Sequence, residues 1–183
     1  MRIASTATLC AALLAAGAAP ARSQEAPIAA RPGPAHAILD SLAGWWSVTA
    51  TFRFGDGPEM EAQASCEAKA VLGGRFLEQQ YRNQTGQETT QYLGYDNPRH
   101  VFFLFKLDNM DTGYLLTEGG ISGDSTTIST TGTRTDPVTG TRARVRIVIT
   151  IPNYNEFRIE WFVTQPDGRE LRTVRLDHTR VNR

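Results

Sequence analysis

From Trp46 onward, apolar and polar residues alternate along the chain in short segments separated by turn sequences. In residues 46–54, for example, Trp46, Val48 and Phe52 alternate with polar residues, the period-two pattern of a strand with one buried face. Glycine, proline, asparagine and aspartate mark the turns between segments. The pattern predicts strands over 46–54, 60–72, 76–82, 87–95, 100–107, 113–121, 126–134, 142–151, 156–165 and 170–179.

About ten evenly spaced strands without a later helix predict an all-β fold. An open sheet of this length would expose two edges to intermolecular pairing, so closure is favoured. We therefore expect an antiparallel up-and-down β-barrel. One short helix precedes it at 35–42, with Pro34 in its first turn and Gly44 ending it. The predicted single barrel domain covers 34–183.

The N-terminal residues have the composition of a targeting segment. Arg2 supplies a positive charge, an Ala-rich apolar run follows, and Ala19-Pro20-Ala21 fits a signal-peptidase site. The run is too short to span a bilayer. We expect a signal peptide at 1–21, cleavage near Ala21, a flexible linker at 22–33, and a secreted, periplasmic protein whose mature chain has no integral membrane segment.

Charge and cysteine content exclude several classes of function. The formal net charge is zero and no basic block occurs, which argues against nucleic-acid binding. Cleavage would remove Cys10 and leave Cys66 alone, so no intramolecular disulfide is expected and Cys66 is interpreted as a small buried side chain. The three histidines match no metal-ligand spacing, and no phosphate-binding loop is present, so neither a metal nor a cofactor is predicted.

The favoured function is non-catalytic binding of a small, largely apolar ligand inside the barrel. The alanine-rich segment 60–72 would leave space inside, and 100–107 is apolar on both faces and rich in phenylalanine. Alternation alone selects Phe52, Ala64, Phe103, Phe105 and Trp161 as candidate ligand-binding residues.

Two other functions stay open at this stage. A small hydrolase or isomerase would use His36 or His178 as general base, supported by Asp108 or Arg75. An interaction module would use the outer face of 100–107 as the seam of a homodimer.

Six short motifs, in order from His36 to Arg180, resemble one bacterial family. The resemblance is to the domain of unknown function 1579 (DUF1579) family, and it implies a calycin-like barrel similar to lipocalins and fatty-acid-binding proteins. It also implies that Gly44, Trp46 and Arg180 form a structural latch, with the arginine over the tryptophan. His178 departs from the aromatic residue usual there, and the family's single tryptophan is doubled as Trp45-Trp46. The family has no established activity. The motifs are His36-x-x-Leu39-x-x-Leu42-Ala43-Gly44-x-Trp46, Leu72-Gly73-Gly74-Arg75-Phe76-Leu77, Leu93-Gly94-Tyr95-Asp96, Asp108-Asn109-Met110-Asp111-Thr112-Gly113, Pro166-Asp167-Gly168-Arg169-Glu170 and Thr179-Arg180.

Overall fold

The computed structural model describes residues 27, 30–53, 55, 57–136 and 140–182. The predicted signal peptide and most of the predicted linker lie outside the described residues. No helix in the described ranges is long and apolar enough to cross a membrane.

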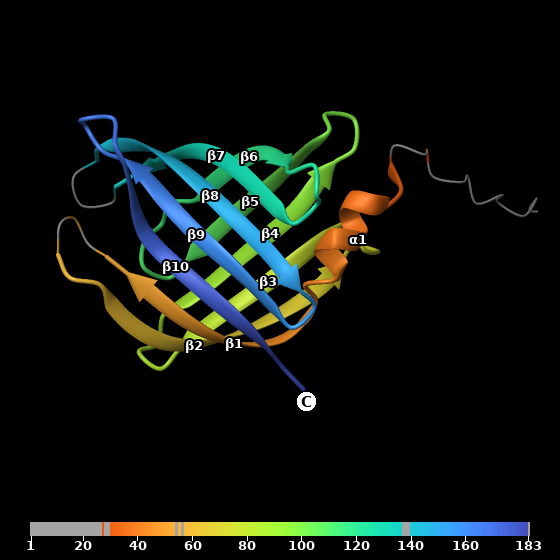
Figure 1. Cartoon of the computed structure of the whole chain (residues 1–183), viewed down its shortest axis with the longest axis horizontal. Helices are drawn as coiled ribbons and strands as arrows, with labels where there is room; N and C mark the ends of the chain where they lie inside the picture. Colours follow the sequence, from red (N-terminus) through yellow and green to blue (C-terminus); the bar gives the residue numbers. More distant parts are fainter. Residues whose placement is uncertain (1–26, 28–29, 54, 56, 137–139, 183) are drawn as a thin grey trace, which may run out of the picture.

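Ten antiparallel strands form one closed barrel, preceded by a single short helix (Figure 1). Each strand pairs with its neighbours in sequence, and β1 pairs with β10 to close the sheet. This confirms the predicted up-and-down barrel. The elements are α1 (Pro34–Asp40), β1 (Gly44–Phe52), β2 (Met60–Val71), β3 (Phe76–Asn83), β4 (Glu88–Asp96), β5 (Val101–Asp108), β6 (Leu115–Ile121), β7 (Thr127–Thr135), β8 (Arg142–Asn153), β9 (Glu156–Thr164) and β10 (Glu170–Val181).

The closing seam is longer than the alternation predicts. β1 begins at Gly44 and β10 ends at Val181, because Trp45 pairs with Val181 and Trp46 with Arg180. Helix α1 stops at Asp40, with Ser41 as its C-cap, before the predicted end at residue 42. The first and last strands therefore start pairing almost as soon as the helix ends.

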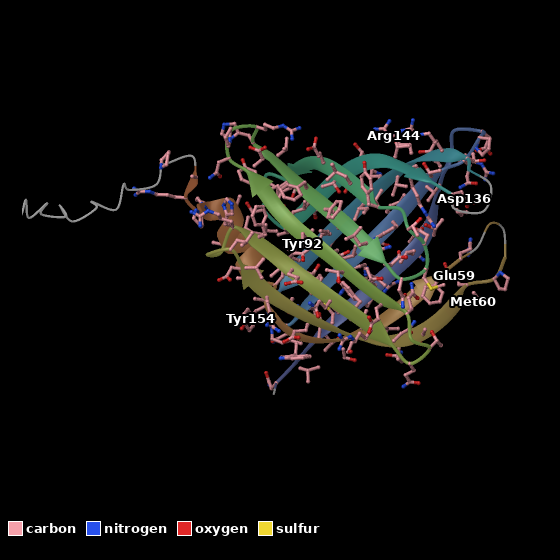
Figure 2. All side chains as sticks on the ribbon, turned by 180° about the vertical axis from the view of Figure 1, so that it is seen from behind. Glu59, Met60, Tyr92, Asp136, Arg144 and Tyr154 are labelled. Atoms are coloured by element: carbon pink, nitrogen blue, oxygen red, sulfur yellow. The ribbon has the colours of Figure 1, made fainter. Side chains whose placement is uncertain are left out.

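The two ends of the barrel differ (Figure 1). At one end α1 contacts β3 and β4, and Leu39 and Leu42 enter the hydrophobic core; we call this the plugged end. Glu59, Met60, Asp136 and Arg144 lie at the opposite end, away from the helix (Figure 2). No helix of the described residues covers that end, and we call it the open end.

The register of the strands defines the inner wall. Val48 faces Ala64 on β2 and His178 on β10, and these positions alternate with solvent-facing ones. The walls of β8 and β9 are apolar inside, with Val145, Ile147, Ile149, Phe157, Ile159 and Trp161 all buried. The inner wall of β3, β4 and β5 carries polar side chains as well as apolar ones, among them Gln79, Gln91 and Lys106.

Candidate ligand-binding site

Arg180 holds the plugged end together. Its guanidinium donates hydrogen bonds to the carbonyl oxygens of Ser41 (2.8 Å), Ala43 (2.7 Å) and Tyr154 (2.9 Å). It lies over the Trp46 ring, with its central carbon 4.1 Å from the ring centroid. The indole N–H of Trp46 donates in turn to the Leu42 carbonyl at 2.9 Å. Every polar atom named here has a partner, and together they join β1, β10 and the segment after α1.

Gly44 makes room for this arginine. Its φ is +138°, a conformation that L side chains rarely adopt. A Cβ at this position would lie 2.5 Å from the Arg180 Nη1 atom. Both the backbone conformation and the close approach of Arg180 therefore require glycine.

Part of the inner wall at the open end is exposed. Phe52, Ala62, Ala64 and Val174, on β1, β2 and β10, face inward but are only partly buried. Across the barrel at the same end, Leu115 and Val145 are fully buried. The partial exposure is therefore confined to one side of this end.

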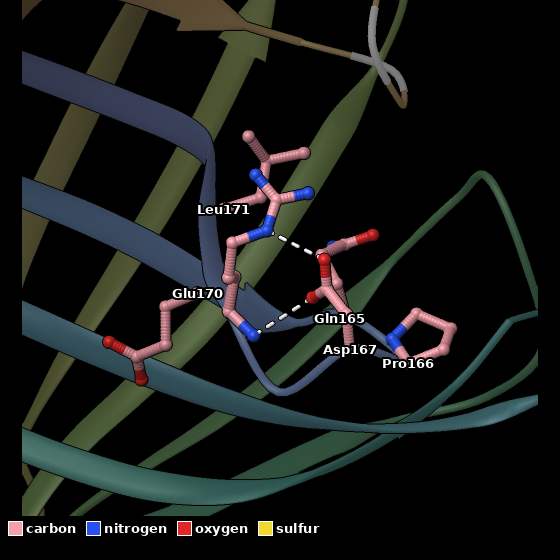
Figure 3. Close-up of a pocket in the computed structure, with 6 residues that line it drawn as sticks. Gln165, Pro166, Asp167, Glu170 and Leu171 are labelled. Carbon is pink, nitrogen blue, oxygen red and sulfur yellow. Dashed lines mark hydrogen bonds and ion pairs between the residues drawn. The ribbon is translucent and has the colours of Figure 1, made fainter.

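Two hollows found among the described residues both lie at this end. The first, of about 310 Å³, is lined by the β9–β10 hairpin, with Gln165 on one side and Leu171 on the other (Figure 3). The second, of about 250 Å³, lies between Ala62 on β2 and Asn83 at the end of β3. Most residues that line the two hollows are exposed, so both hollows belong to the rim of the barrel.

A polar stripe runs along the inner wall from the core toward the open end. Gln79 on β3 pairs with Gln91 on β4, and Gln91 pairs with Lys106 on β5. Gln79 and Gln91 are buried, and the side chain of Lys106 is 18% exposed. On β7, Arg134 lies on the same strand face as the buried Thr130 and is exposed at the rim. The stripe thus ends toward solvent in an ion pair, because Lys106 pairs with Asp108.

Lys106 reaches across the barrel. Its ammonium forms an ion pair with Asp108 and lies 5.3 Å from the centroid of the Trp161 ring on β9. Burial alone would raise the pKa of Asp108, but Lys106 and the backbone N–H groups of Met110 and Asp111 outweigh it and lower the pKa. Asp108 is therefore a carboxylate that fixes the position of Lys106.

Below Lys106, a chain of hydrogen bonds crosses the core. The Gln91 amide nitrogen donates to the Gln79 side-chain oxygen at 2.7 Å and to the Tyr81 hydroxyl at 3.3 Å. Tyr81 Oη lies 3.0 Å from His178 Nε2, and His178 Nδ1 lies 3.2 Å from the Leu176 carbonyl oxygen. The chain thus connects β4 and β3 with β10.

His178 is neutral in this setting. Its ring stacks on Phe157 with centroids 3.7 Å apart and meets Trp46 edge-on at 6.3 Å. Burial lowers the pKa of His178 to about 3, outweighing its hydrogen bonds to backbone. A histidine with so low a pKa is a poor general base at neutral pH.

Cys66 is a buried thiol beside Tyr81. Its side chain is fully buried and hydrogen-bonded to the Tyr81 side chain. Burial raises the pKa of the Cys66 thiol to about 12, so the reactive thiolate is suppressed.

Two donors on the inner wall have no partner. The side-chain nitrogen of Gln79 and the indole nitrogen of Trp161 are buried without a hydrogen bond. Gln79 is fully buried and Trp161 is 7% exposed. An unpaired buried donor costs about 1–3 kcal/mol. Such a cost marks a position where an acceptor atom is expected.

Comparison with known proteins identifies the family. The family model described as "Protein of unknown function (DUF1579)" matches residues 31–180. The chain belongs to this family. No curated protein matches it. Among solved structures, the crystal structure of Rv2717c from M. tuberculosis matches with a TM-score of 0.57 and 17% sequence identity, over 83% of this chain and 100% of that one. This likeness concerns the fold alone.

In this DUF1579 protein the four candidate catalytic residues do not form one constellation, although His36 and Arg75 are close enough for the Arg75 charge to contribute to the lowered pKa of His36. Within the described part of the chain, no hydrogen bond or ion pair joins any two of His36, Arg75, Asp108 and His178. His36 accepts from the Gly33 N–H at the start of α1, and burial lowers the pKa of His36. Arg75 donates to the carbonyls of Ala30 and Leu72. The described residues also contain no cluster suited to a metal ion.

Three of the five predicted lining residues, Phe52, Ala64 and Trp161, lie on the inner face. The placement of Phe103 and Phe105 inside the barrel was wrong. Both strand faces are aromatic there, so alternation could not choose between them; Phe102 and Leu104 are the buried inward residues.

The two displaced phenylalanines lie on the outer wall. The Phe103 ring covers Gly94, where a Cβ would lie 2.3 Å from it, and packs near Phe76 with centroids 6.0 Å apart. Phe105 packs near exposed Tyr114.

The sequence interpretation missed the polar stripe. Gln79, Gln91 and Lys106 stand at inward positions of strands whose inward residues nearer the helix, such as Leu77, Leu93 and Leu104, are apolar. Such interruptions of an apolar face were the available signal. They become a site only because the register places the three side chains next to one another.

Proposed function

We propose that this protein binds a small, largely apolar molecule in the open half of the barrel without transforming it. The observation that carries the proposal is the partial exposure of Phe52, Ala64 and Val174, which face inward on the β1, β2 and β10 side of the open end. Eight strands already enclose a space that side chains just fill, and ten strands enclose a wider one.

The two sides of the interior favour different parts of a ligand. The apolar wall around Val163 and Val174 suits an apolar body, and the stripe from Gln91 to Lys106 suits a polar end. Catalysis is not part of the proposal, because the candidate acid–base groups are held in separate contacts and His178 is neutral.

The proposal is tested with N-phenyl-1-naphthylamine, an uncharged apolar probe that becomes fluorescent in apolar surroundings. We expect saturable binding to the purified protein. Ala64→Phe, which adds a ring inside the open half, should weaken binding at least tenfold. Ser65→Phe places the same ring at the neighbouring exposed position and is the matched control. Saturable binding that Ala64→Phe leaves unchanged would contradict the proposed location.

A second candidate function is self-association through the outer wall. Leu107 and Leu116 are each 42% exposed and Tyr114 is 69% exposed, beside Phe105 on β5 and β6. This apolar surface motivates the proposal of a homodimer. Sedimentation velocity at several concentrations tests it: Leu116→Asp should shift any dimer to monomer, and concentration-independent monomer in the unmodified protein would exclude it.

We also propose that the protein is exported. The Ala19-Pro20-Ala21 sequence and the apolar run before it support a cleaved signal peptide. N-terminal sequencing of the protein from periplasmic extract should begin near Arg22. A mature chain that retains Met1 would contradict export by cleavage.

A further inference from the structure

The hydrogen-bond chain in the core has a fixed direction. The Leu176 carbonyl oxygen can only accept, so His178 Nδ1 must carry the proton that joins them. A neutral imidazole has one N–H, and the deep burial of His178 keeps it neutral. Its Nε2 atom is therefore the acceptor.

Each following bond is then determined. Tyr81 must donate its only hydroxyl proton to His178 Nε2. The Gln91 atom that contacts the Tyr81 oxygen must be a donor, so it is the amide nitrogen. The same nitrogen contacts Gln79, whose contacting atom must accept and is the carbonyl oxygen. The remaining end of Gln79 is consequently its NH₂ group.

The Leu176 carbonyl on β10 thus determines that the NH₂ end of the Gln79 side chain on β3 is the free end. The Gln79 NH₂ group is fully buried and has no partner. The Trp161 N–H is a second buried donor without a partner, and Lys106 lies over the same indole ring. Among the described residues no buried side-chain oxygen lacks a partner. The unsatisfied groups of the interior are all donors.

We propose that the interior selects ligands that carry an oxyanion, such as a carboxylate, on an apolar body. Gln79 and Trp161 supply neutral N–H donors, and Lys106 supplies the positive charge by sharing its ammonium between Asp108 and the ligand. Tyr81 and His178 are positioning residues that keep the Gln79 amide from turning. The inference rests on the proposed function and adds the chemistry of the ligand's polar end.

Three probes of equal chain length test the selection. Octanoate, octan-1-ol and octylamine are titrated against the full chain by calorimetry. Octanoate should bind at least tenfold more tightly than octan-1-ol, and octylamine more weakly than either. Binding of octan-1-ol as tight as that of octanoate would overturn the inference while leaving the proposed function in place. Failure of all three probes to bind would overturn the inference, and the naphthylamine titration decides the proposed function separately.

Lysine substitutions assign the charge. Lys106→Met should reduce the ratio of octanoate to octan-1-ol affinity about tenfold. Lys69→Met is the matched control, because Lys69 is the other lysine of the chain and its side chain is 60% exposed. The double variant Lys106→Met with Asp108→Asn avoids an unpaired carboxylate if the single variant folds poorly. An unchanged affinity ratio in both Lys106 variants would contradict the assigned role of Lys106.

Tyrosine substitutions and NMR test the positioning role. Tyr81→Phe should lower the same affinity ratio several-fold without weakening octan-1-ol binding; Tyr92→Phe on the outer wall should not. In ligand-free protein, ¹⁵N shifts should show His178 protonated at Nδ1 and bare at Nε2. Octanoate should then move the Trp161 indole N–H downfield. The opposite tautomer of His178 would overturn the direction of the chain whether or not a ligand binds.

Discussion

The two ends of this barrel treat a buried tryptophan differently. Trp46, at the plugged end, donates its indole N–H to Leu42 and lies beneath Arg180, whose own donors also have partners. Trp161, nearer the open end, is buried with its N–H unpaired and a lysine over its ring. A satisfied polar network stabilises a fold, whereas unsatisfied donors are a cost that a bound acceptor could relieve. The satisfied network and the unpaired indole donor thus occupy different parts of the same barrel.

The family motifs at the closing seam and the polar stripe of the interior are separate groups of residues. Gly44, Trp46 and Arg180 belong to the first and the last of the six family motifs, and Arg180 joins them through its contacts with Trp46 and with backbone carbonyls. The polar stripe contributes to none of these contacts. Four predictions test the contrast, in decreasing order of expected effect.

Acid pH should act on the core through His178. The folded-state pKa, about 3, lies below the usual value of 6.5, so the unfolded chain takes up a proton that the folded one does not. The free energy of unfolding is therefore unaffected by His178 above pH 6.5, and it falls by about 1.4 kcal/mol per pH unit as the pH is lowered from 6.5 toward 3. Urea unfolding between pH 4.5 and 6.5 measures this slope.

Two histidine variants assign the slope to its source. His178→Gln should remove most of it, and His100→Gln, at an exposed position, should retain it. Asp108 at the open end does not affect this slope. Its pKa is lowered from 3.8, so its stabilisation is present above pH 3.8 and is lost as the pH falls through the lowered value. Equal slopes in the two histidine variants would refute the assignment.

Arg180→Ala should lower the free energy of unfolding by about 3 kcal/mol. Three backbone carbonyls would lose a charged hydrogen-bond donor, and the Trp46 ring would lose the guanidinium that lies over it. Arg169 at the open end is 81% exposed and pairs only within its own turn. Arg169→Ala should change stability by less than about 0.5 kcal/mol. Similar losses in the two variants, measured by urea unfolding, would show that the ends do not differ in this respect.

Replacing two glycines by alanine separates the effect of a nearby side chain from the effect of a positive φ alone. Gly44→Ala should cost about 2 kcal/mol, since it meets both a positive φ and the Arg180 side chain. Gly86 has φ +83° with nothing near its missing Cβ, so Gly86→Ala should cost about 1 kcal/mol. Thermal unfolding of both variants gives the difference. A greater loss for Gly86→Ala would contradict the role of Arg180.

The smallest effect comes from replacing each tryptophan by phenylalanine. Trp46→Phe should lower stability by about 1–2 kcal/mol, because the Leu42 carbonyl loses its donor. Trp161→Phe removes an unpaired N–H and should change stability by less than about 0.5 kcal/mol. Chemical denaturation in the absence of ligand checks both. A larger loss for Trp161→Phe would indicate that its N–H already has a strong partner.

Much of the fold follows from local pattern. Period-two alternation predicts each of the ten strands, and turn residues set their lengths to within a few positions. The strand Val101–Asp108 is where this reasoning failed, because Phe102 to Phe105 are apolar on both faces. Only packing against Gly94 on the outside, and against the core on the inside, distinguishes Phe103 from Phe102.

The sequence by itself determined the positions of the strands and of the turns between them, because alternation and turn chemistry act between near neighbours in the chain. Tertiary structure alone decided which polar side chains meet inside. Gln79, Gln91 and Lys106 become neighbours through strand register, and His178 joins Tyr81 across 97 residues of chain. The direction of that hydrogen-bond chain depends on a carbonyl of Leu176, whose place in the barrel no local pattern specifies. Hydrogen bonds act over a few ångströms in space, so only closure of the barrel could assemble them.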